Sequence, residues 1–216
     1  MPKIKLPTKS PHIDMTPMVD LFSVVLTFLM LTATMRQTEP APVDTPTSIS
    51  EKPTPDFNNM TLILSKDDRV FLNISNYRIL GQDSTNAFRP KILAEMGTRY
   101  GIEFTASELR EFEKYPSSMG VPMDKMKEFL AAKDAKAKLV FETGIPTDST
   151  NNQLAMWILY TRKINPDVQA CIKGDSKTGY PIVKKVLSIL QDYKVNRFSL
   201  ITNLEAVKTN VAEIKK

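Results

Sequence analysis

The sequence contains very few of the residues on which most catalytic and metal sites depend. Among its 216 residues there is one cysteine and one histidine. The cysteine, Cys171, excludes a disulfide within the chain, and its place in a predicted strand favours core packing over a reactive thiol. The histidine, His12, lies near the N-terminus and leaves the rest of the chain without a histidine base or ligand.

Glycine is also scarce, with seven residues, and neither a G-x-G-x-x-G pattern nor a Walker loop occurs. A loop that cradles the phosphates of a nucleotide is therefore not expected. Together with the single histidine and the single cysteine, this argues against an enzyme, a bound cofactor and a metal site.

Residues 15–35 form a long hydrophobic segment. They include a single charged side chain, Asp20, and 21 residues of helix measure about 30 Å, the thickness of the hydrocarbon core of a bilayer. Three lysines and one aspartate precede the segment, whereas four acids accompany two basic residues between 36 and 56. The positive-inside rule then predicts a cytoplasmic tail, 1–14, and places the chain after Arg36 outside.

Two other interpretations of this segment remain open. A cleaved signal peptide has the same basic start, but its apolar stretch is shorter and ends in small residues, where this chain has Met35 and Arg36. A buried core helix is usually shorter and carries a charged face, which this segment lacks. An uncleaved anchor that spans the membrane once is the preferred interpretation.

Residues 36–57 form a predicted linker. Five prolines lie there among threonine, serine and acidic residues, a composition that resists helix formation and buries no core. We therefore expect an extended tether, at about 3.1 Å per residue, that lets the following domain stand clear of the membrane.

Residues 58–216 have the pattern of one α/β domain. Apolar and polar residues alternate before the turn signal at 66–68, which predicts a hairpin. Thr105 and Glu108 form a capping-box pattern, and Asp148 or Ser149 is the expected N-cap of a later helix. The last predicted helix and its two flanking strands have the size of a βαβ unit. The predicted strands are 60–65, 70–72, 139–141, 168–173 and 198–202, and the predicted helices begin near Arg89, Thr105, Pro122, Ser149 and Tyr180.

Asp20 is the residue that most needs an explanation. A carboxylate at the centre of a membrane helix costs about 2.5 to 3.5 kcal/mol, so it requires a partner or a function. One interpretation makes Thr16 the N-cap and places Asp20 in the first turn, where the helix dipole favours an acid. In the other, Ser23, Thr27 and Thr34 share a stripe with Asp20, and a desolvated carboxyl on that stripe takes up and releases protons. The residues alone leave both open.

Two stretches of the chain resemble the ExbD/TolR family of biopolymer-transport proteins. The first is DMTPMVDL at 14–21, with the apolar stretch that ends in FLMLT at 28–32. The second is VQACIKGD at 168–175, followed by FSLIT at 198–202 and by apolar residues between them at Tyr180, Val183, Val186, Leu187 and Leu190. Together they cover the N-terminal third and about the last 50 residues.

The resemblance implies a subunit of an inner-membrane motor driven by the proton-motive force, with a cytoplasmic tail, one span, a linker and a small periplasmic α/β domain. It implies that Asp20 carries the proton, and it makes Ser23 and Thr27 candidates for hydrogen bonding to it. It further implies a homodimer within a polytopic partner of the ExbB/TolQ type, and a TonB- or TolA-like protein that receives the motion. The motors of gliding and secretion systems share the Thr-Pro-Met span and remain a near alternative, as does a membrane-anchored adaptor without a proton role.

Two features depart from that family. A long region, 81–152, makes this chain longer than compact members, and the linker lacks the apolar Leu-Pro segment of many relatives. From Phe57 onward, 24 basic residues exceed 18 acidic ones, which gives the outer domain a charge of about +6. Such a surface is either ordinary solvated protein or suited to diffuse attraction for the carboxylates of peptidoglycan. Nucleic acid is not expected as a partner, because the domain is predicted to lie outside the cytoplasm.

Overall fold

The computed structural model describes residues 15–32, 40–50, 52–53, 58–75, 88–115, 118–132 and 134–205. Contacts divide the chain into two compact units, Met1–Gln37 and Thr38–Lys216. The predicted cytoplasmic tail, 1–14, the end of the predicted span, 33–35, and the C-terminal residues from 206 lie outside the described residues.

The described residues of the first unit form the helix α1 (Thr16–Thr32), of 17 residues. No side chain of this helix is buried, and its leucines, valines and phenylalanines are exposed on all sides. Among the helices that the structure describes, none combines the length and the hydropathy that crossing a bilayer requires.

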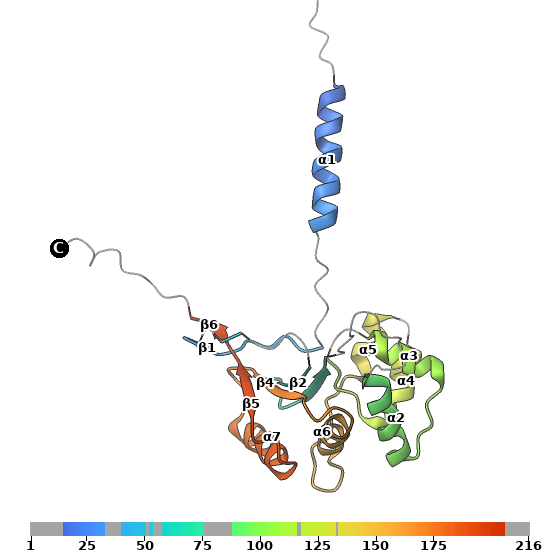
Figure 1. The fold of residues 1–216 in the computed structure, drawn as a ribbon, viewed down its shortest axis with the longest axis vertical. Coiled ribbons are helices and arrows are strands. Elements are labelled where there is room, and N and C mark those ends of the chain that lie inside the picture. The colour runs from blue at the N-terminus through green and yellow to red at the C-terminus, as the bar shows by residue number, and fades with distance from the viewer. Residues whose placement is uncertain are drawn as a thin grey trace, which may run out of the picture. The chain divides into compact units, whose positions relative to one another are not determined.

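The second unit is an α/β domain built on a four-stranded sheet in the order β3-β2-β4-β5 (Figure 1). Strands β2 (Asn59–Leu64) and β3 (Val70–Ile74) form the predicted antiparallel hairpin. Strand β4 (Gln169–Gly174) pairs parallel with β2, and β5 (Phe198–Ile201) pairs parallel with β4. Helix α7 (Tyr180–Asp192) connects β4 to β5, which confirms the predicted βαβ unit.

One face of the sheet and the helices enclose the main hydrophobic core. Alternate residues of β2 and β3 point into it, as do Ala170 and Ile172 of β4. Helix α6 (Gln153–Ile164) contributes Trp157 and Ile158. Figure 1 shows α6 and α7 together on this side of the sheet. Cys171 is fully buried, and burial raises the pKa of its thiol, which confirms the prediction of a packed core residue.

Between β3 and α6 the chain forms a group of short helices, which we call the helical segment (88–141). Its members are α2 (Phe88–Tyr100), α3 (Ala106–Lys114), the 3-10 helix η2 (Met123–Lys125), α4 (Met126–Ala131) and α5 (Ala135–Phe141). The predicted capping box is present: Thr105 accepts a hydrogen bond from the Glu108 backbone, and the Glu108 carboxylate accepts one from the Thr105 backbone.

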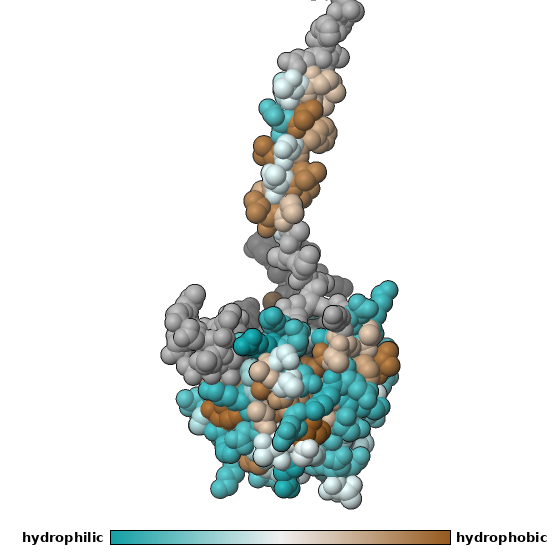
Figure 2. Space-filling view, turned by 90° about the vertical axis from the view of Figure 1, so that its right-hand side faces the viewer, coloured by the Kyte–Doolittle hydropathy of each residue, from teal (hydrophilic) through white to brown (hydrophobic). Residues whose placement is uncertain are grey.

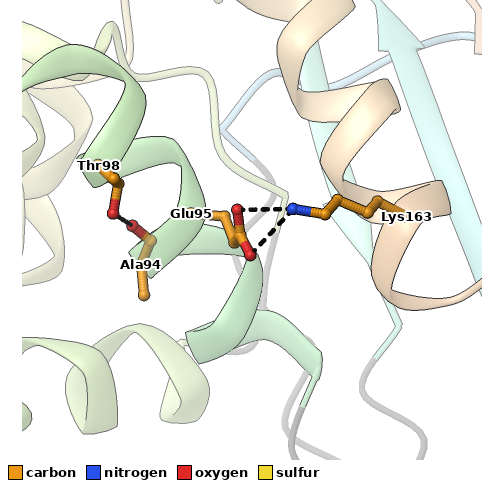
Figure 3. A network of polar contacts seen from close by, with 4 residues as sticks. All are labelled: Ala94, Glu95, Thr98 and Lys163. Atoms are coloured by element: carbon orange, nitrogen blue, oxygen red, sulfur yellow. Dashed lines mark hydrogen bonds and ion pairs between the residues drawn. The ribbon is translucent and has the colours of Figure 1, made fainter.

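The helical segment is joined to the sheet and to α6. Leu72 of β3 exchanges backbone hydrogen bonds with Met119, so the outer edge of β3 is paired with this region. The helical segment is joined to α6 by Lys163 of α6, which donates to both carboxylate oxygens of Glu95 on α2, at 3.2 and 3.1 Å (Figure 3). Because this ion pair is exposed, we expect it to orient the two helices more than to stabilise them.

Two local predictions are wrong. Residues 139–141 form the end of helix α5 instead of a buried strand, and Val140 is 75% exposed. The preceding alanines and lysines are strong helix formers, and they extend the helix through this short apolar run. The N-cap of α6 is Asn152, whose side chain accepts from the Ala155 backbone, instead of Asp148 or Ser149. The backbone carbonyl of Asp148 accepts a hydrogen bond from the Asn151 backbone N–H, in the turn before α6.

The prediction that the linker buries nothing is also wrong for part of it. Residues 40–48, which we call the strap, pack on the face of the sheet opposite the helices. Ala41 is buried and Val43 half-buried against Ile63 and Phe71, and β1 (Thr47–Ser48) pairs parallel with β6 (Asn203–Leu204). Proline does not prevent this docking, because an extended segment can place small apolar side chains on a sheet without forming a helix.

Asp175, directly after β4, fastens the strap to the domain. One of its carboxylate oxygens accepts from the Asp44 backbone at 3.0 Å, and the Asp44 carbonyl accepts from the Ser176 backbone at 2.8 Å. The backbone N–H groups of Lys177 and Asp44 hold the pKa of the Asp175 carboxyl below its usual range. The strap is therefore held by an ionised carboxylate that bridges two segments far apart in the sequence.

Replacing Asp175 with alanine is expected to loosen the strap. The measurement is hydrogen exchange of the amides in 40–48, which should become faster in Asp175→Ala. Asp67→Ala is the matched control, because Asp67 is an exposed acid that pairs only locally with Arg69. In the wild type, docking should be complete above the usual aspartate pKa of about 3.9 and lost as the pH falls through the lowered pKa. Equal rates of amide hydrogen exchange in Asp175→Ala and Asp67→Ala would contradict the role of Asp175 in holding the strap.

Candidate functional site

The candidate site lies on α1, around its only acidic residue. The helix begins at Thr16, and the Val19 backbone donates to the Met15 carbonyl at 3.1 Å. Asp20 is thus the fifth residue of the helix, and no acid lies in the first turn. The favourable effect of the helix dipole on an acid fades beyond that turn, so the capping explanation for Asp20 loses much of its physical basis.

Asp20 belongs to a narrow polar stripe along an otherwise hydrophobic helix. Ser23 and Thr27 follow it at spacings of three and seven residues, which places them on one side of a helix. Figure 2 shows a column of hydrophilic and near-neutral side chains along α1, bordered by hydrophobic ones. Thr34, the fourth predicted member, lies outside the described residues.

The hydroxyl groups of the stripe differ in what they contact. Thr27 donates to the Val24 carbonyl of its own helix at 2.9 Å. Its hydroxyl hydrogen is therefore engaged within the helix, although its oxygen can still accept a hydrogen bond. The structure gives Ser23 no bond to Asp20. It thus places the two predicted support residues on the same side as the acid without joining them to it.

Comparison with known protein families identifies the family to which this chain belongs. The model of the family "Biopolymer transport protein ExbD/TolR" matches residues 7–205. The chain belongs to the ExbD/TolR family. The matched range includes the helical segment as well as the two stretches that resemble the family. Searches of curated proteins and of solved structures returned no significant match.

Membership in the ExbD/TolR family fixes the general role of the chain. Members are non-enzymatic subunits of proton-driven transport motors, anchored in the inner membrane. They act with partners of the ExbB/TolQ and TonB/TolA types. A helix with a single acid and an otherwise apolar, exposed surface agrees with a subunit of such a complex.

Among its described residues, the α/β domain offers no metal centre that competes with α1. No group of three or more histidine, cysteine or acidic side chains there is placed to hold a metal ion. The adjacent acids of the hairpin turn are turn residues: Asp67 pairs with Arg69 at 2.8 Å, and Asp68 has a positive φ of 57°.

Two notable acids of the outer domain were not recognised from the sequence. Asp175 lies in a stretch that resembled the family, yet its bond to the Asp44 backbone joins residues 131 positions apart. Glu142 is a buried acid whose partner, Tyr115, lies 27 positions away, directly after α3. No local pattern marks either residue, because both roles depend on contacts between distant segments.

Proposed function

We propose that this chain is the ExbD-type subunit of an inner-membrane motor that uses the proton-motive force to energise TonB-dependent transport across the outer membrane. In this proposal residues 15–35 span the membrane once, residues 1–14 are cytoplasmic, and the domain after the linker is periplasmic. Asp20 takes up a proton from one side and releases it to the other, and Ser23 and Thr27 support it by hydrogen bonding. The long region 81–152 is an insertion into the compact domain of the family.

The observation that carries the proposal is the position of Asp20. It is an acid beyond the first helical turn, on a polar stripe, in a helix whose remaining surface is hydrophobic. Transferring a lone carboxylate into hydrocarbon is costly, so the stripe is best accommodated against other helices, where the acid can be desolvated and still exchange protons. A pore formed by a polytopic ExbB/TolQ-like subunit, with two copies of this chain inside, provides such surroundings.

The movement produced by proton transfer is passed in this proposal to a TonB-like transducer. Peptidoglycan is a candidate ligand of the outer domain, supported only by its net charge of about +6. A TolR-like role in envelope maintenance, or in a gliding or secretion motor, uses the same helix and the same acid. An anchored adaptor uses the helix only for attachment to the membrane and gives Asp20 no proton role.

Purification of the full chain in a mild detergent separates the motor from the adaptor. We expect a protein with three or more membrane spans to be retained in constant ratio to this chain, because the polar stripe of α1 needs a helical neighbour. The matched control is a variant in which Ser23 and Thr27 are replaced by valine while Asp20 is kept. It should retain the partner less well, although the chain is still anchored. Recovery of the wild-type chain alone, from cells that express its neighbouring genes, would favour the adaptor.

A further inference from the structure

A buried acid that the motor proposal does not use lies directly after the helical segment. Glu142 follows the last residue of α5 and is 3% exposed. One of its carboxylate oxygens accepts from the Tyr115 hydroxyl at 2.8 Å. Among the described residues, its other oxygen, Oε2, is buried and has no hydrogen-bond partner. A buried carboxylate with an unsatisfied oxygen is costly, so the protonation state of Glu142 matters for how this region packs.

The contacts around Glu142 are also those that hold α5 in place. Lys138 of α5 lies over the rings of Tyr115 and Phe129, with its Nζ 5.1 and 5.4 Å from their centroids. These two rings pack edge to face, at 5.1 Å between centroids, and so join the end of α3 to α4. Leu139 and Val140 of α5, in contrast, point to solvent. The helix is therefore attached largely through Lys138, Glu142 and the half-buried Phe141.

Among the described residues, few charged groups lie near Glu142. Lys138 is the cation that favours the ionised form of Glu142, yet it lies over the aromatic rings and makes no ion pair with the carboxylate in the described structure. Arg89 of α2 donates to the Tyr115 carbonyl and stacks on Phe112. The negative charge of Glu113 favours the charged form of Arg89. Burial lowers the pKa of Arg89 to about 10, so it stays charged at neutral pH. Neither cation neutralises Glu142 by direct contact.

We propose that Glu142 is a pH-sensitive latch, which holds α5 against α3 and α4 while its carboxyl is protonated and loosens the helix once it is ionised. Burial raises the pKa of Glu142, and this outweighs the opposing effects of the Tyr115 hydroxyl and of Lys138. Since the folded state binds this proton more tightly than the unfolded state, the stabilisation is present at acidic pH. It is lost as the pH rises from the usual glutamate value of about 4.3 through the raised pKa.

The consequence of opening is a change in the surface of the helical segment. When α5 moves away, the rings of Tyr115 and Phe129 lose the Lys138 side chain that covers them. The apolar residues that α5 already exposes then change position as well. A domain exposed to a compartment of variable pH would thereby present one surface in acid and another near neutrality.

The test is hydrogen exchange of the full chain in detergent, between about pH 4.5 and about pH 8, with each rate divided by its intrinsic value at that pH. We expect the protection of amides 135–142 to fall as the pH rises, about tenfold for each pH unit by which the pKa of Glu142 is raised. Glu142→Gln, which stays neutral, should keep α5 protected at all pH values. Glu128→Gln, on the exposed side of α4, should behave like the wild type.

A second variant keeps the test decisive if Glu142→Gln fails to fold. Tyr115→Phe keeps the ring but removes the hydroxyl that stabilises the ionised acid, so the opening midpoint should move to higher pH. A purely structural role of Tyr115 would lower protection at every pH without moving the midpoint. The latch is refuted if protection in the wild type does not depend on pH, if Glu142→Gln keeps the wild-type dependence, or if Tyr115→Phe leaves the midpoint unchanged.

Discussion

Asp20→Asn is expected to abolish proton flux and all energy-dependent transport while leaving the chain folded and bound to its partner. Asparagine has nearly the size of aspartate and retains a carbonyl acceptor, but it has no proton to give up and no charge to receive one. Packing and capping therefore change little, whereas proton transfer through this position ends. The measurement is proton flux through the complex reconstituted in vesicles, followed with a pH-sensitive dye, together with uptake in cells carrying the variant gene.

Two controls make this result specific. Asp20→Glu keeps an ionisable carboxyl one methylene further from the helix and should retain part of the flux. Thr27→Val keeps the shape of the side chain and removes the hydroxyl, which already donates to the Val24 carbonyl, so we expect only a modest reduction. Full energy-dependent uptake in Asp20→Asn, at normal protein level, would end the motor proposal and support an adaptor.

Trp157→Ala is expected to cost the outer domain about 3 to 5 kcal/mol of folding free energy. Trp157 is the only tryptophan, is fully buried in α6 and packs against Phe112 of α3, with 6.1 Å between ring centroids. Its removal leaves a cavity between the helical segment and the rest of the core. Because a domain is stable by about 5 to 15 kcal/mol in total, this loss is a large share of it.

The measurement is urea unfolding of the full chain followed by far-ultraviolet circular dichroism, since the variant has no tryptophan fluorescence. Leu159→Ala is the matched control: it lies in the same helix but is 40% exposed, and leucine and alanine have similar helix propensities. It should cost less than about 1 kcal/mol. Trp157→Phe retains most of the ring and should be milder than Trp157→Ala, because the indole N–H has no partner among the described residues. Equal losses in Trp157→Ala and Leu159→Ala would contradict the packing argument.

The outer domain shows which predictions depend on local sequence. The hairpin of β2 and β3 is recognisable because alternation and a turn signal lie within 15 residues. The capping box of α3 is likewise contained in four consecutive residues. The LVF run at 139–141 misled the prediction because three apolar residues fit a buried strand or the end of a helix equally well, and only the surrounding packing distinguishes them.

The strap shows what amino-acid composition alone does not predict. Its prolines correctly exclude a helix, but whether an extended segment is free or docked depends on a surface elsewhere in the chain. That surface includes Ile63 and Phe71, which point away from the main core and leave the second face of the sheet apolar. Apolar residues on both faces of a strand indicate that both faces are covered. This signal is present in the sequence, but it does not identify the segment that covers the second face.

The sequence by itself determined the features that lie in one segment: the hydrophobic helix, its single acid, the polar stripe and the family motif around it. The first three follow from the periodicity of a helix and the cost of a charge in hydrocarbon, and the motif is a resemblance carried by a short run of residues, so none of them needs knowledge of distant residues. Only the tertiary structure decided that β4 and β5 are parallel, that Asp175 fastens the strap and that Glu142 is buried against Tyr115. Each of these depends on contacts between residues far apart in the chain, and such contacts leave no local pattern in it.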